Sequence, residues 1–365
     1  MKCTDIIIVS LILLFSSCTK VVVSGDDVSG MSQCDVIGWN VTATDQSEGF
    51  DPITRALIEN YDDLKNACTP LETQETEKIG LLGKYILGEK TKVVFDNSEL
   101  WWWEKNEVNP YYDSQGNNSF WNYPGENIYW ADNADYTFKA YFPKSKVELQ
   151  PGSGADKLLI VYDTELFQYD LLVAHKALRS KSENPVNLVM KNALAALKFD
   201  FQFVEGGATD QLIACWLENK AENAFFTSST LNYDGKIVWP YSTSNPVGSR
   251  IYYWEPITPL QISNNSAAVA YSTPASSNNG SIYTDNSGWL LIIPQSNSNA
   301  GMTRLCFKTS TGGSTVYSID IPAYDFQPGY RYSYHVNMTS TGIDLKLSIA
   351  DWNERKSSYE IDFNE

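Results

Sequence analysis

The feature that most constrains the fold is a period-two alternation of apolar and polar residues that recurs along the chain. In "LKFDFQF", residues 197–203, the leucine and the phenylalanines occupy alternate positions, with polar residues between them. Because successive side chains of a strand face opposite sides, this alternation predicts a β-strand with one buried face. Two further alternating runs, 330–338 and 343–349, flank the short turn "TSTG" and predict a β-hairpin.

One segment, "DPITRALIENYDDLKNAC" at residues 51–68, has helical spacing instead. Asp51 can cap the first turn, and Pro52 suits the first helical position. Apolar residues recur at intervals of three or four: Leu57, Tyr61, Leu64 and Cys68. This pattern predicts a short helix.

The length of 365 residues is enough for roughly two domains of about 150 residues each. The amino-acid composition changes at "RSKSENP", which ends at Pro185 and is the candidate domain boundary. Many short strands separated by polar turns predict an all-β protein. We therefore expect two tandem β-sandwich domains, 35–185 and 186–365, with a short helix near the N-terminus.

The first twenty residues, "MKCTDIIIVSLILLFSSCTK", are typical of an export signal. Lys2 is followed by an apolar run over residues 6–15, which is too short to span a bilayer. The small residues and the cysteine that follow resemble a bacterial lipoprotein signal, although phenylalanine stands where leucine is usual. We expect a signal peptide over 1–17, lipid on Cys18 and a flexible tether over 18–34. An ordinary signal peptide with an incidental cysteine is the alternative.

The formal net charge of −17 argues against nucleic acid as a partner, because binding phosphates requires lysine and arginine. Beyond the signal segment the chain has four cysteines: Cys34, Cys68, Cys215 and Cys306. Export would permit disulfides, but spacing does not reveal their pairing. Buried free thiols and one or two disulfides therefore both stay open.

The sequence lacks the motifs of common catalytic and metal sites. Its two histidines, His175 and His335, lie in no nucleophile elbow, zinc-binding helix or other catalytic motif. "DSQGNN", from Asp113, lacks the acidic residue that closes a calcium loop. We therefore expect no enzyme activity, no metal and no cofactor.

Aromatic residues are abundant, with 11 Trp and 22 Tyr, and many fall between residues 100 and 130. Exposed aromatic side chains stack on sugars or form protein-binding patches. The candidate contact residues for a glycan or a protein partner are Trp101, Trp102, Trp103 and Trp121. The alternative is that these side chains fill the core.

The chain ends in "ERKSSYEIDFNE", where Tyr359, Ile361 and Phe363 alternate with polar residues. Terminal residues are usually frayed and polar unless they are held in place. This amphipathic tail therefore predicts a partner strand, either in its own sheet or in another molecule.

Several segments resemble the fimbrillins of Bacteroidales, the FimA-like and Mfa-like subunits of type V pili. They are "VNLVMKNALAALKFDFQF" at 186–203, "DLLVA" at 170–174, "LIIPQ" at 291–295 and "FQPGYRYSYHVNMTSTGIDLKLSIADWNE" at 326–354. Asn192 stands where the family usually has histidine. The resemblance implies transthyretin-like β-sandwiches in a pilus subunit at the bacterial surface.

The resemblance also implies assembly by strand exchange. In that family a lipidated precursor reaches the outer membrane, and a protease that cuts after a basic residue removes the first strand. A C-terminal strand of a neighbouring subunit then fills the vacated groove. On this chain the processing residues would be Arg55 and Ala56. The lost strand would present Ile37, Trp39 and Val41, and the donor strand would present Tyr359, Ile361 and Phe363.

The predicted helix bears on this scheme, because Arg55 falls in its first turn and cleavage there requires local unfolding. Without cleavage the protein would stay in the membrane as a lipid-retained pilus anchor. A further alternative is a surface lipoprotein that binds glycans through its exposed Trp and Tyr residues. The expected partners are thus other pilus subunits, the outer membrane and, as an open question, a ligand on a host or bacterial surface.

Overall fold

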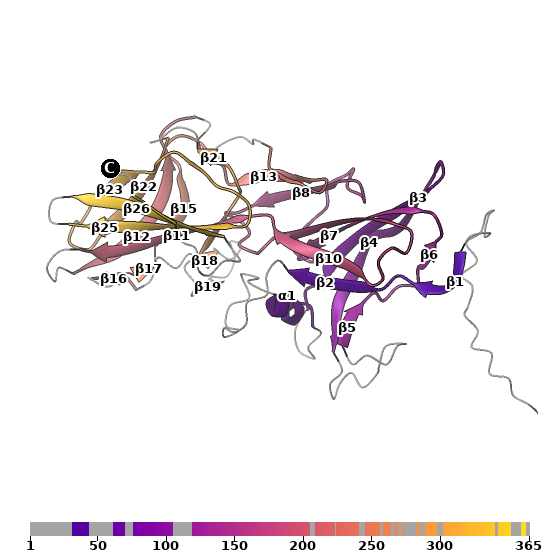
Figure 1. The fold of residues 1–365 in the computed structure, drawn as a ribbon. Helices are drawn as coiled ribbons and strands as arrows, with labels where there is room; N and C mark the ends of the chain where they lie inside the picture. The colour runs from indigo at the N-terminus through magenta and orange to yellow at the C-terminus, as the bar shows by residue number, and fades with distance from the viewer. Residues whose placement is uncertain are drawn as a thin grey trace, which may run out of the picture.

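The computed structural model of the chain describes residues 31–43, 61–69, 76–104, 119–204, 209–222, 224–240, 245–255, 258–263, 267–268, 272–273, 283–284, 289–297, 302–339, 342–351 and 359–362. Strands are the main regular structure of these residues, with one short helix, α1 (Tyr61–Ala67). The strands gather in two groups at opposite ends of an elongated molecule (Figure 1). The predicted all-β class with a short helix near the N-terminus is confirmed.

The N-terminal group is built on a seven-stranded sheet. In sheet order its strands are β2 (Trp39–Ala43), β10 (Val186–Asn192), β9 (Leu172–Arg179), β7 (Asp135–Phe142), β3 (Ile79–Leu87), β4 (Lys90–Glu104) and β5 (Ser119–Asn122). A two-stranded ribbon, β1 (Met31–Val36) with β6 (Tyr129–Ala131), lies at its outer end. One hydrophobic core includes β2, β7 and α1, and a second includes β8 (Leu158–Asp163) and β13 (Ser228–Tyr233).

The C-terminal group is a sandwich of two sheets around a single hydrophobic core. The first sheet contains β17 (Ala267–Ala268), β11 (Ala195–Phe203), β25 (Tyr330–Met338), β26 (Ile343–Asp351) and β27 (Tyr359–Asp362), and β20 (Leu290–Ile292) pairs with β11. The second contains β15 (Arg250–Trp254), β12 (Asp210–Asn219), β22 (Thr303–Thr309) and β23 (Tyr317–Asp320), and β16 (Leu260–Ile262) pairs with β12. Two small ribbons complete the described strands: β18 (Ser272–Thr273) with β19 (Tyr283–Thr284), and β21 (Ser296–Asn297) with β24 (Tyr324–Asp325).

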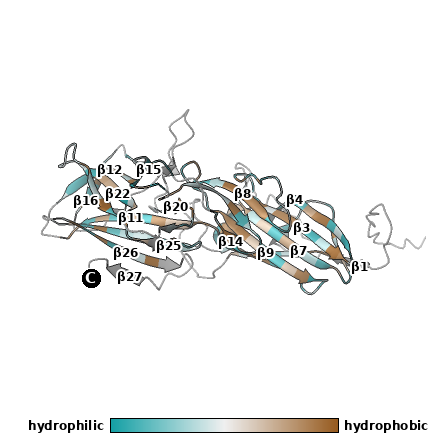
Figure 2. Ribbon diagram, turned by 90° about the horizontal axis from the view of Figure 1, so that it is seen from above, coloured by the Kyte–Doolittle hydropathy of each residue, from teal (hydrophilic) through white to brown (hydrophobic). Residues whose placement is uncertain are grey.

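The alternation in the sequence is the alternation of burial in this sandwich. Leu197, Phe199 and Phe201 of β11 are fully buried, whereas Lys198 between them is half-buried on the other face. The predicted hairpin is β25 and β26, whose closing pair is Met338 and Ile343. Hydrophilic and hydrophobic residues alternate visibly along these strands (Figure 2).

A separate three-stranded sheet joins strands from distant parts of the sequence. β8 (Leu158–Asp163) pairs along its whole length with β13 (Ser228–Tyr233), which also pairs with β14 (Ile237–Val238). β10, which follows Pro185, lies in the N-terminal sheet, and the chain enters the C-terminal sandwich only at Ala195. The sheets therefore change between Asn192 and Ala195, whereas the composition break lies at Pro185.

Polar side chains from the turn after β8 fasten the two groups together. The Gln168 amide donates to the Leu291 carbonyl at 3.0 Å and accepts from the Leu291 N–H at 2.7 Å. The nearby Glu165 carboxylate accepts the backbone N–H of Tyr252 at 3.0 Å and the Asn245 amide at 3.3 Å. Tyr252 has a φ of 52°, in the left-handed region that a tyrosine rarely adopts, so this contact holds a constrained backbone.

Replacing Gln168 should weaken this junction. Gln168→Ala removes both hydrogen bonds to Leu291 and leaves a buried backbone donor and acceptor without these partners, so we expect the free energy of unfolding to fall by about 2–3 kcal/mol. Chemical denaturation of the purified chain measures this change. Gln211→Ala, at an exposed glutamine on β12, is the control. An equal effect of the two substitutions would contradict the role of Gln168.

Asp210, at the start of β12, is a buried carboxylate. Hydrogen-bond donors surround it, most of them from the residues that follow β22. It accepts the Gln211 N–H at 2.7 Å, the Ser310 hydroxyl at 2.8 Å and the Thr311 N–H at 3.1 Å. Burial acts to raise the pKa of Asp210, but hydrogen bonds from Thr311, Ser310 and their neighbours outweigh it and lower the pKa to about 2. The fold thus favours the charged carboxylate.

The lowered pKa of Asp210 predicts that the protein loses stability in acid. Because the folded-state pKa is below the ordinary value, the stabilisation from Asp210 is complete above pH 4 and is lost as pH falls through about 2. Asp210→Asn should therefore lower the free energy of unfolding by about 2 kcal/mol at neutral pH, with a difference from the unsubstituted chain that shrinks below pH 4. Denaturation measured at several pH values checks this, with Asp320→Asn at an exposed position as control. A difference that does not vary with pH would refute it.

Candidate strand-binding groove

β2 forms one edge of the seven-stranded sheet, and β10 is its one neighbour there among the described strands. The two strands run parallel, in register from Trp39 opposite Val186 to Ala43 opposite Met190. β2 comes from the start of the chain, and β10 lies about 150 residues further along it. An edge strand with a single neighbour can leave without breaking any other pair of strands in the sheet.

The side chains of β2 and of the residues before it fill the core of this sheet at alternate positions. Ile37, Trp39 and Val41 are 5%, 7% and 0% exposed, as the sequence predicted for one face of a strand. The Trp39 ring packs edge-to-face against Phe95 and Phe138, at 5.2 Å from each. Without β2 these two rings would line an open hydrophobic groove.

The Trp39 indole Nε1 is buried and has no hydrogen-bond acceptor among the described residues. A buried polar group without a partner costs about 1–3 kcal/mol. The strand therefore fills its groove with large hydrophobic side chains but leaves one polar group unsatisfied.

A few polar contacts hold β2 in place beyond its pairing with β10. The Asn184 side chain accepts the Gly38 N–H at 2.8 Å and donates to the Val36 carbonyl at 3.0 Å. The Asn40 amide donates to Asn187 at 2.6 Å. Sequence reasoning missed Asn184 and Asn187. The alternating pattern of β10 marks Asn187 as an outward-facing residue but does not reveal its partner across 147 residues.

Trp121, one of the predicted partner contacts, belongs to this groove. It is 4% exposed, and its indole Nε1 donates to the Val41 carbonyl at 3.2 Å. Trp102 packs against it with ring centroids 5.5 Å apart, and Trp101 lies under the Lys78 ammonium at 5.3 Å. Both Trp101 and Trp102 are half-buried, and the side chain of Trp103 lies outside the described residues. The described part of the cluster is thus largely packed inside the domain.

α1 closes the groove beside β2. Leu64 and Cys68 are fully buried against the same core, at the helical spacing that the sequence predicted. The processing residues Arg55 and Ala56 lie outside the described residues, as does Cys18. Their roles stay predictions.

The tail of the chain lies in the other group of strands. β27 pairs antiparallel with β26, from Tyr359 opposite Ile349 to Asp362 opposite Lys346, and forms an edge of the six-stranded sheet. In this conformation the tail is a strand of its own sheet, which is one of the two alternatives that the sequence left open. Phe363 lies outside the described residues, and the donor role of Tyr359, Ile361 and Phe363 stays a prediction.

Cys68 and Cys306 are free thiols in the structure, and Cys215 is buried. Cys215 and Cys306 lie on neighbouring strands but on opposite faces of the sheet, because Cys306 is paired with Trp216, the residue after Cys215. Burial, followed by the nearby Glu218 carboxylate, raises the pKa of Cys306 to about 11, so its thiol stays protonated at neutral pH. The side chain of Cys34 lies outside the described residues.

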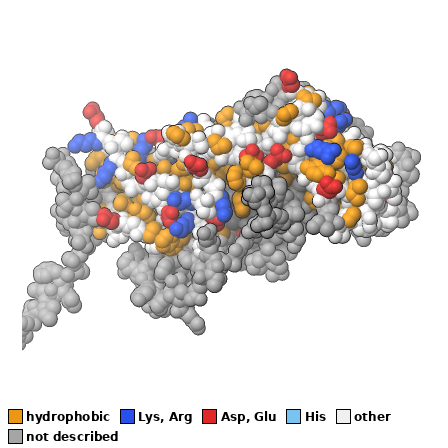
Figure 3. Space-filling view, turned by 180° about the vertical axis from the view of Figure 1, so that it is seen from behind, with side chains coloured by type: hydrophobic (Ala, Val, Ile, Leu, Met, Phe, Trp, Pro, Cys, Tyr) orange, Lys and Arg blue, Asp and Glu red, His pale blue; other side chains and the backbone are white. Residues whose placement is uncertain are grey.

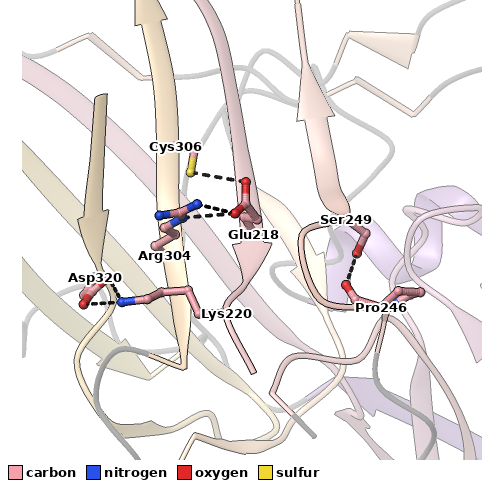
Figure 4. Close-up of polar contacts among 7 residues, drawn as sticks. All are labelled: Glu218, Lys220, Pro246, Ser249, Arg304, Cys306 and Asp320. Carbon is pink, nitrogen blue, oxygen red and sulfur yellow. Dashed lines mark hydrogen bonds and ion pairs between the residues drawn. The ribbon is translucent and has the colours of Figure 1, made fainter. Parts of the chain in front are cut away.

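The outer face of the five-stranded sheet carries ion pairs rather than a reactive centre. Figure 4 shows Arg304 bound to Glu218 beside Cys306, and Lys220 bound to Asp320 at 2.8 Å. Each of these charges is matched by a neighbour on an adjacent strand or strand end. In the same view the Ser249 hydroxyl donates to the Pro246 carbonyl at 2.7 Å, which closes a turn.

A second polar group, on the six-stranded sheet, superficially resembles a catalytic triad. His335 Nε2 lies 2.9 Å from the Ser348 hydroxyl, but His335 Nδ1 is 3.7 Å from Asp200, too far for a hydrogen bond. Lys198 already pairs with Asp200 at 3.2 Å. Ser348 is on β26, which is paired with β25 on one side and β27 on the other. The backbone N–H groups near Ser348 are therefore used in the sheet and do not form an oxyanion hole. This geometry supports sheet packing and no acyl transfer.

The described residues provide neither a metal-binding group nor a membrane-spanning helix. They contain no group of three side chains able to hold a metal ion. No helix among them has the length and apolar character needed to cross a membrane.

The fold defines a class of elongated, two-part β-sandwich protein in which an edge strand near the N-terminus fills a core groove. Residues 69–352 match the model of the fimbrillin-like family. The chain belongs to the fimbrillin-like family. Membership associates it with cell-surface fimbriae.

The chain shares its fold with one solved structure and is similar to a second. A fimbrial protein from Bacteroides vulgatus is 14% identical, with a TM-score of 0.55, and the match covers 87% of this chain and 99% of that one. A candidate cell adhesion protein from Bacteroides uniformis is 15% identical, with a TM-score of 0.47 over 87% of this chain and 98% of that one. No curated protein matches the chain.

Proposed function

We propose that the chain is a structural subunit of a fimbria, exported as a lipoprotein on Cys18 and assembled by strand exchange in the outer membrane. Cleavage after Arg55 releases β2, and a C-terminal strand from a neighbouring subunit fills the groove. The observation that carries this proposal is β2 itself, an edge strand that pairs with one described neighbour yet supplies Trp39 and Val41 to the core, as does Ile37 just before it.

The sequence of the tail fits the groove that β2 occupies. Tyr359, Ile361 and Phe363 are spaced two residues apart, as are the three core residues of the first strand. An incoming strand that places isoleucine or phenylalanine in the Trp39 position leaves no indole N–H buried without an acceptor. The exchange therefore keeps the hydrophobic contacts and removes one unfavourable group.

The position of β27 supports its proposed role as the donor strand. β27 is also an edge strand with a single described neighbour, β26, so it can leave its own sheet without disrupting the pairs beside it. Since β2 and β27 lie in different groups of strands, exchange between copies links the C-terminal group of one subunit to the N-terminal group of the next. Repetition of this contact makes a fibre.

Mass spectrometry of the protein isolated from cells tests the proposal. A processed subunit begins at Ala56, whereas a lipid-retained anchor begins at a lipidated Cys18. An N-terminus at neither residue would overturn both forms of the proposal. Glycan binding through Trp101, Trp102 and Trp103 stays a separate prediction, which calorimetry with the chain and its Trp→Ala variants tests.

A further inference from the structure

The hairpin between β3 and β4 ends in an exposed apolar tip. Ile86, Leu87 and Val93 are 38%, 43% and 60% exposed, although the same two strands bury Leu81, Phe95 and other large side chains. Gly88 turns the chain with a φ of +60° and has open space around it. The tip thus presents three hydrophobic side chains on a narrow projection.

Cations flank these side chains. Lys90 is exposed and Lys92 half-buried, while Glu89 is the one acidic residue in the turn. Lys84, further down the hairpin, is already paired with Asp156 at 2.6 Å. The chain as a whole carries a formal charge of −17, so a tip with excess positive charge differs from the rest of the protein.

The neighbouring strand ends contribute further charges of both signs. Asp135 lies opposite Ile86 on one side and opposite Arg179 on the other. Asp132 lies in the turn before Asp135, and Lys181 in the turn after Arg179. These acids and bases balance, and Glu89 offsets one of the two charges of Lys90 and Lys92, so the tip has an excess of one positive charge. Seen from behind, Lys and Arg side chains stand beside hydrophobic ones at this end of the molecule (Figure 3).

The tip lies at the end of the molecule from which the N-terminal segment departs. Met31, the first described residue, pairs with Ala131, and Asp135 a few residues later pairs with Ile86 at the tip. Figure 1 shows β1 and the β3–β4 hairpin at this same end. The thirteen residues from Cys18 to Met31 reach at most about 45 Å, so a lipid on Cys18 would hold this end close to the membrane.

We propose that the β3–β4 tip docks on an anionic lipid surface. Ile86, Leu87 and Val93 enter the boundary between headgroups and acyl chains, and Lys90 and Lys92 meet lipid phosphates. This arrangement has the chemistry of interfacial membrane anchors, in which buried apolar side chains and basic residues act together. The location of the tip rests on the proposed lipidation, whereas the affinity of the tip for lipid does not.

Vesicle flotation of the unlipidated chain from Thr19 onward tests this inference, since that chain contains every described residue. The probes are vesicles of phosphatidylcholine alone and vesicles that also contain phosphatidylglycerol. We expect the chain to float with the anionic vesicles. A triple variant, Ile86→Ser, Leu87→Ser and Val93→Ser, should bind them at least about tenfold less. Lys90→Gln and Lys92→Gln should each reduce binding to them about fivefold.

A matched control comes from the middle of the molecule, where Val161 and Val238 are each 47% exposed. Val161→Ser with Val238→Ser should leave flotation unchanged, and circular dichroism verifies that all variants are folded. Failure of the unsubstituted chain to float with anionic vesicles overturns the inference. A tip that binds an acidic protein instead of lipid would give that result. Equal flotation of the tip and control variants also overturns it. Because this assay requires neither lipidation nor polymerisation, its failure is separate from a failure of the proposed function.

Discussion

A chain that ends at Ser358 should fold as a monomer and form no fibres. The deletion removes Tyr359, Ile361 and Phe363, the three apolar side chains proposed to fill a neighbour's groove. Folding should survive because β27 lies at the edge of its sheet and pairs with β26 alone among the described strands. After treatment with a trypsin-like protease, size-exclusion chromatography and electron microscopy measure the loss of polymer, which we expect to be complete.

The control is a chain that ends at Phe363, which keeps all three apolar residues and removes only the last two. We expect it to form fibres like the full chain. Fibres formed equally well by the chain ending at Ser358 would eliminate the tail as donor. A deletion variant that melts far below the full chain would show instead that β27 is needed for the fold of its own subunit.

Trp39→Ala should produce a large effect on one form of the protein and none on the other. In the uncleaved monomer it removes a buried indole from between Phe95 and Phe138, and truncation of a buried tryptophan costs about 3–5 kcal/mol. In fibres assembled from cleaved subunits, residue 39 has been removed together with β2. Fibre stability should therefore equal that of the unsubstituted protein.

Denaturation of the monomer and thermal dissociation of the fibres measure the two effects. Phe138→Ala is the matched control, because Phe138 belongs to the same core but lies on β7, which stays in both forms. It should destabilise monomer and fibre alike. If Trp39→Ala also weakens the fibres by a similar amount, then β2 has not been replaced.

The local pattern of the sequence predicts much of the fold because strand burial has a period of two. The phenylalanines of β11 and the β25–β26 hairpin lie as their alternation requires, and α1 forms where Leu64 and Cys68 recur at helical spacing. These features depend on residues close together in the sequence.

Pairing between distant strands is different, because alternation says which face of a strand is buried but not which strand lies beside it. The parallel pairing of β2 with β10, and the sheet that β8 shares with β13, therefore had no signal in the single sequence. The composition break at Pro185 marks a turn before β10, while the chain crosses to the other sheets only after Asn192.

The candidate groove shows the same division. The alternation of Ile37, Trp39 and Val41 marks them as core residues, and the structure buries all three. The partners of β2 could not be predicted, since Trp121 reaches it, and Asn184 reaches the residues just before it, through side-chain hydrogen bonds from distant segments. Aromatic density alone also did not distinguish Trp121, which is buried, from a surface contact.

The sheet shared by β8 and β13 imposes an order on biogenesis. A chain that crosses a membrane from its N-terminus delivers β2 first, yet β2 pairs with β10, and β8 pairs with β13. Contacts between segments this far apart form late, because a long loop must close before they gain any stability. The N-terminal half must therefore remain in an unfinished state until Tyr233 has emerged. Until then its hydrophobic strands lack their partners, a state in which partly folded chains are prone to aggregate.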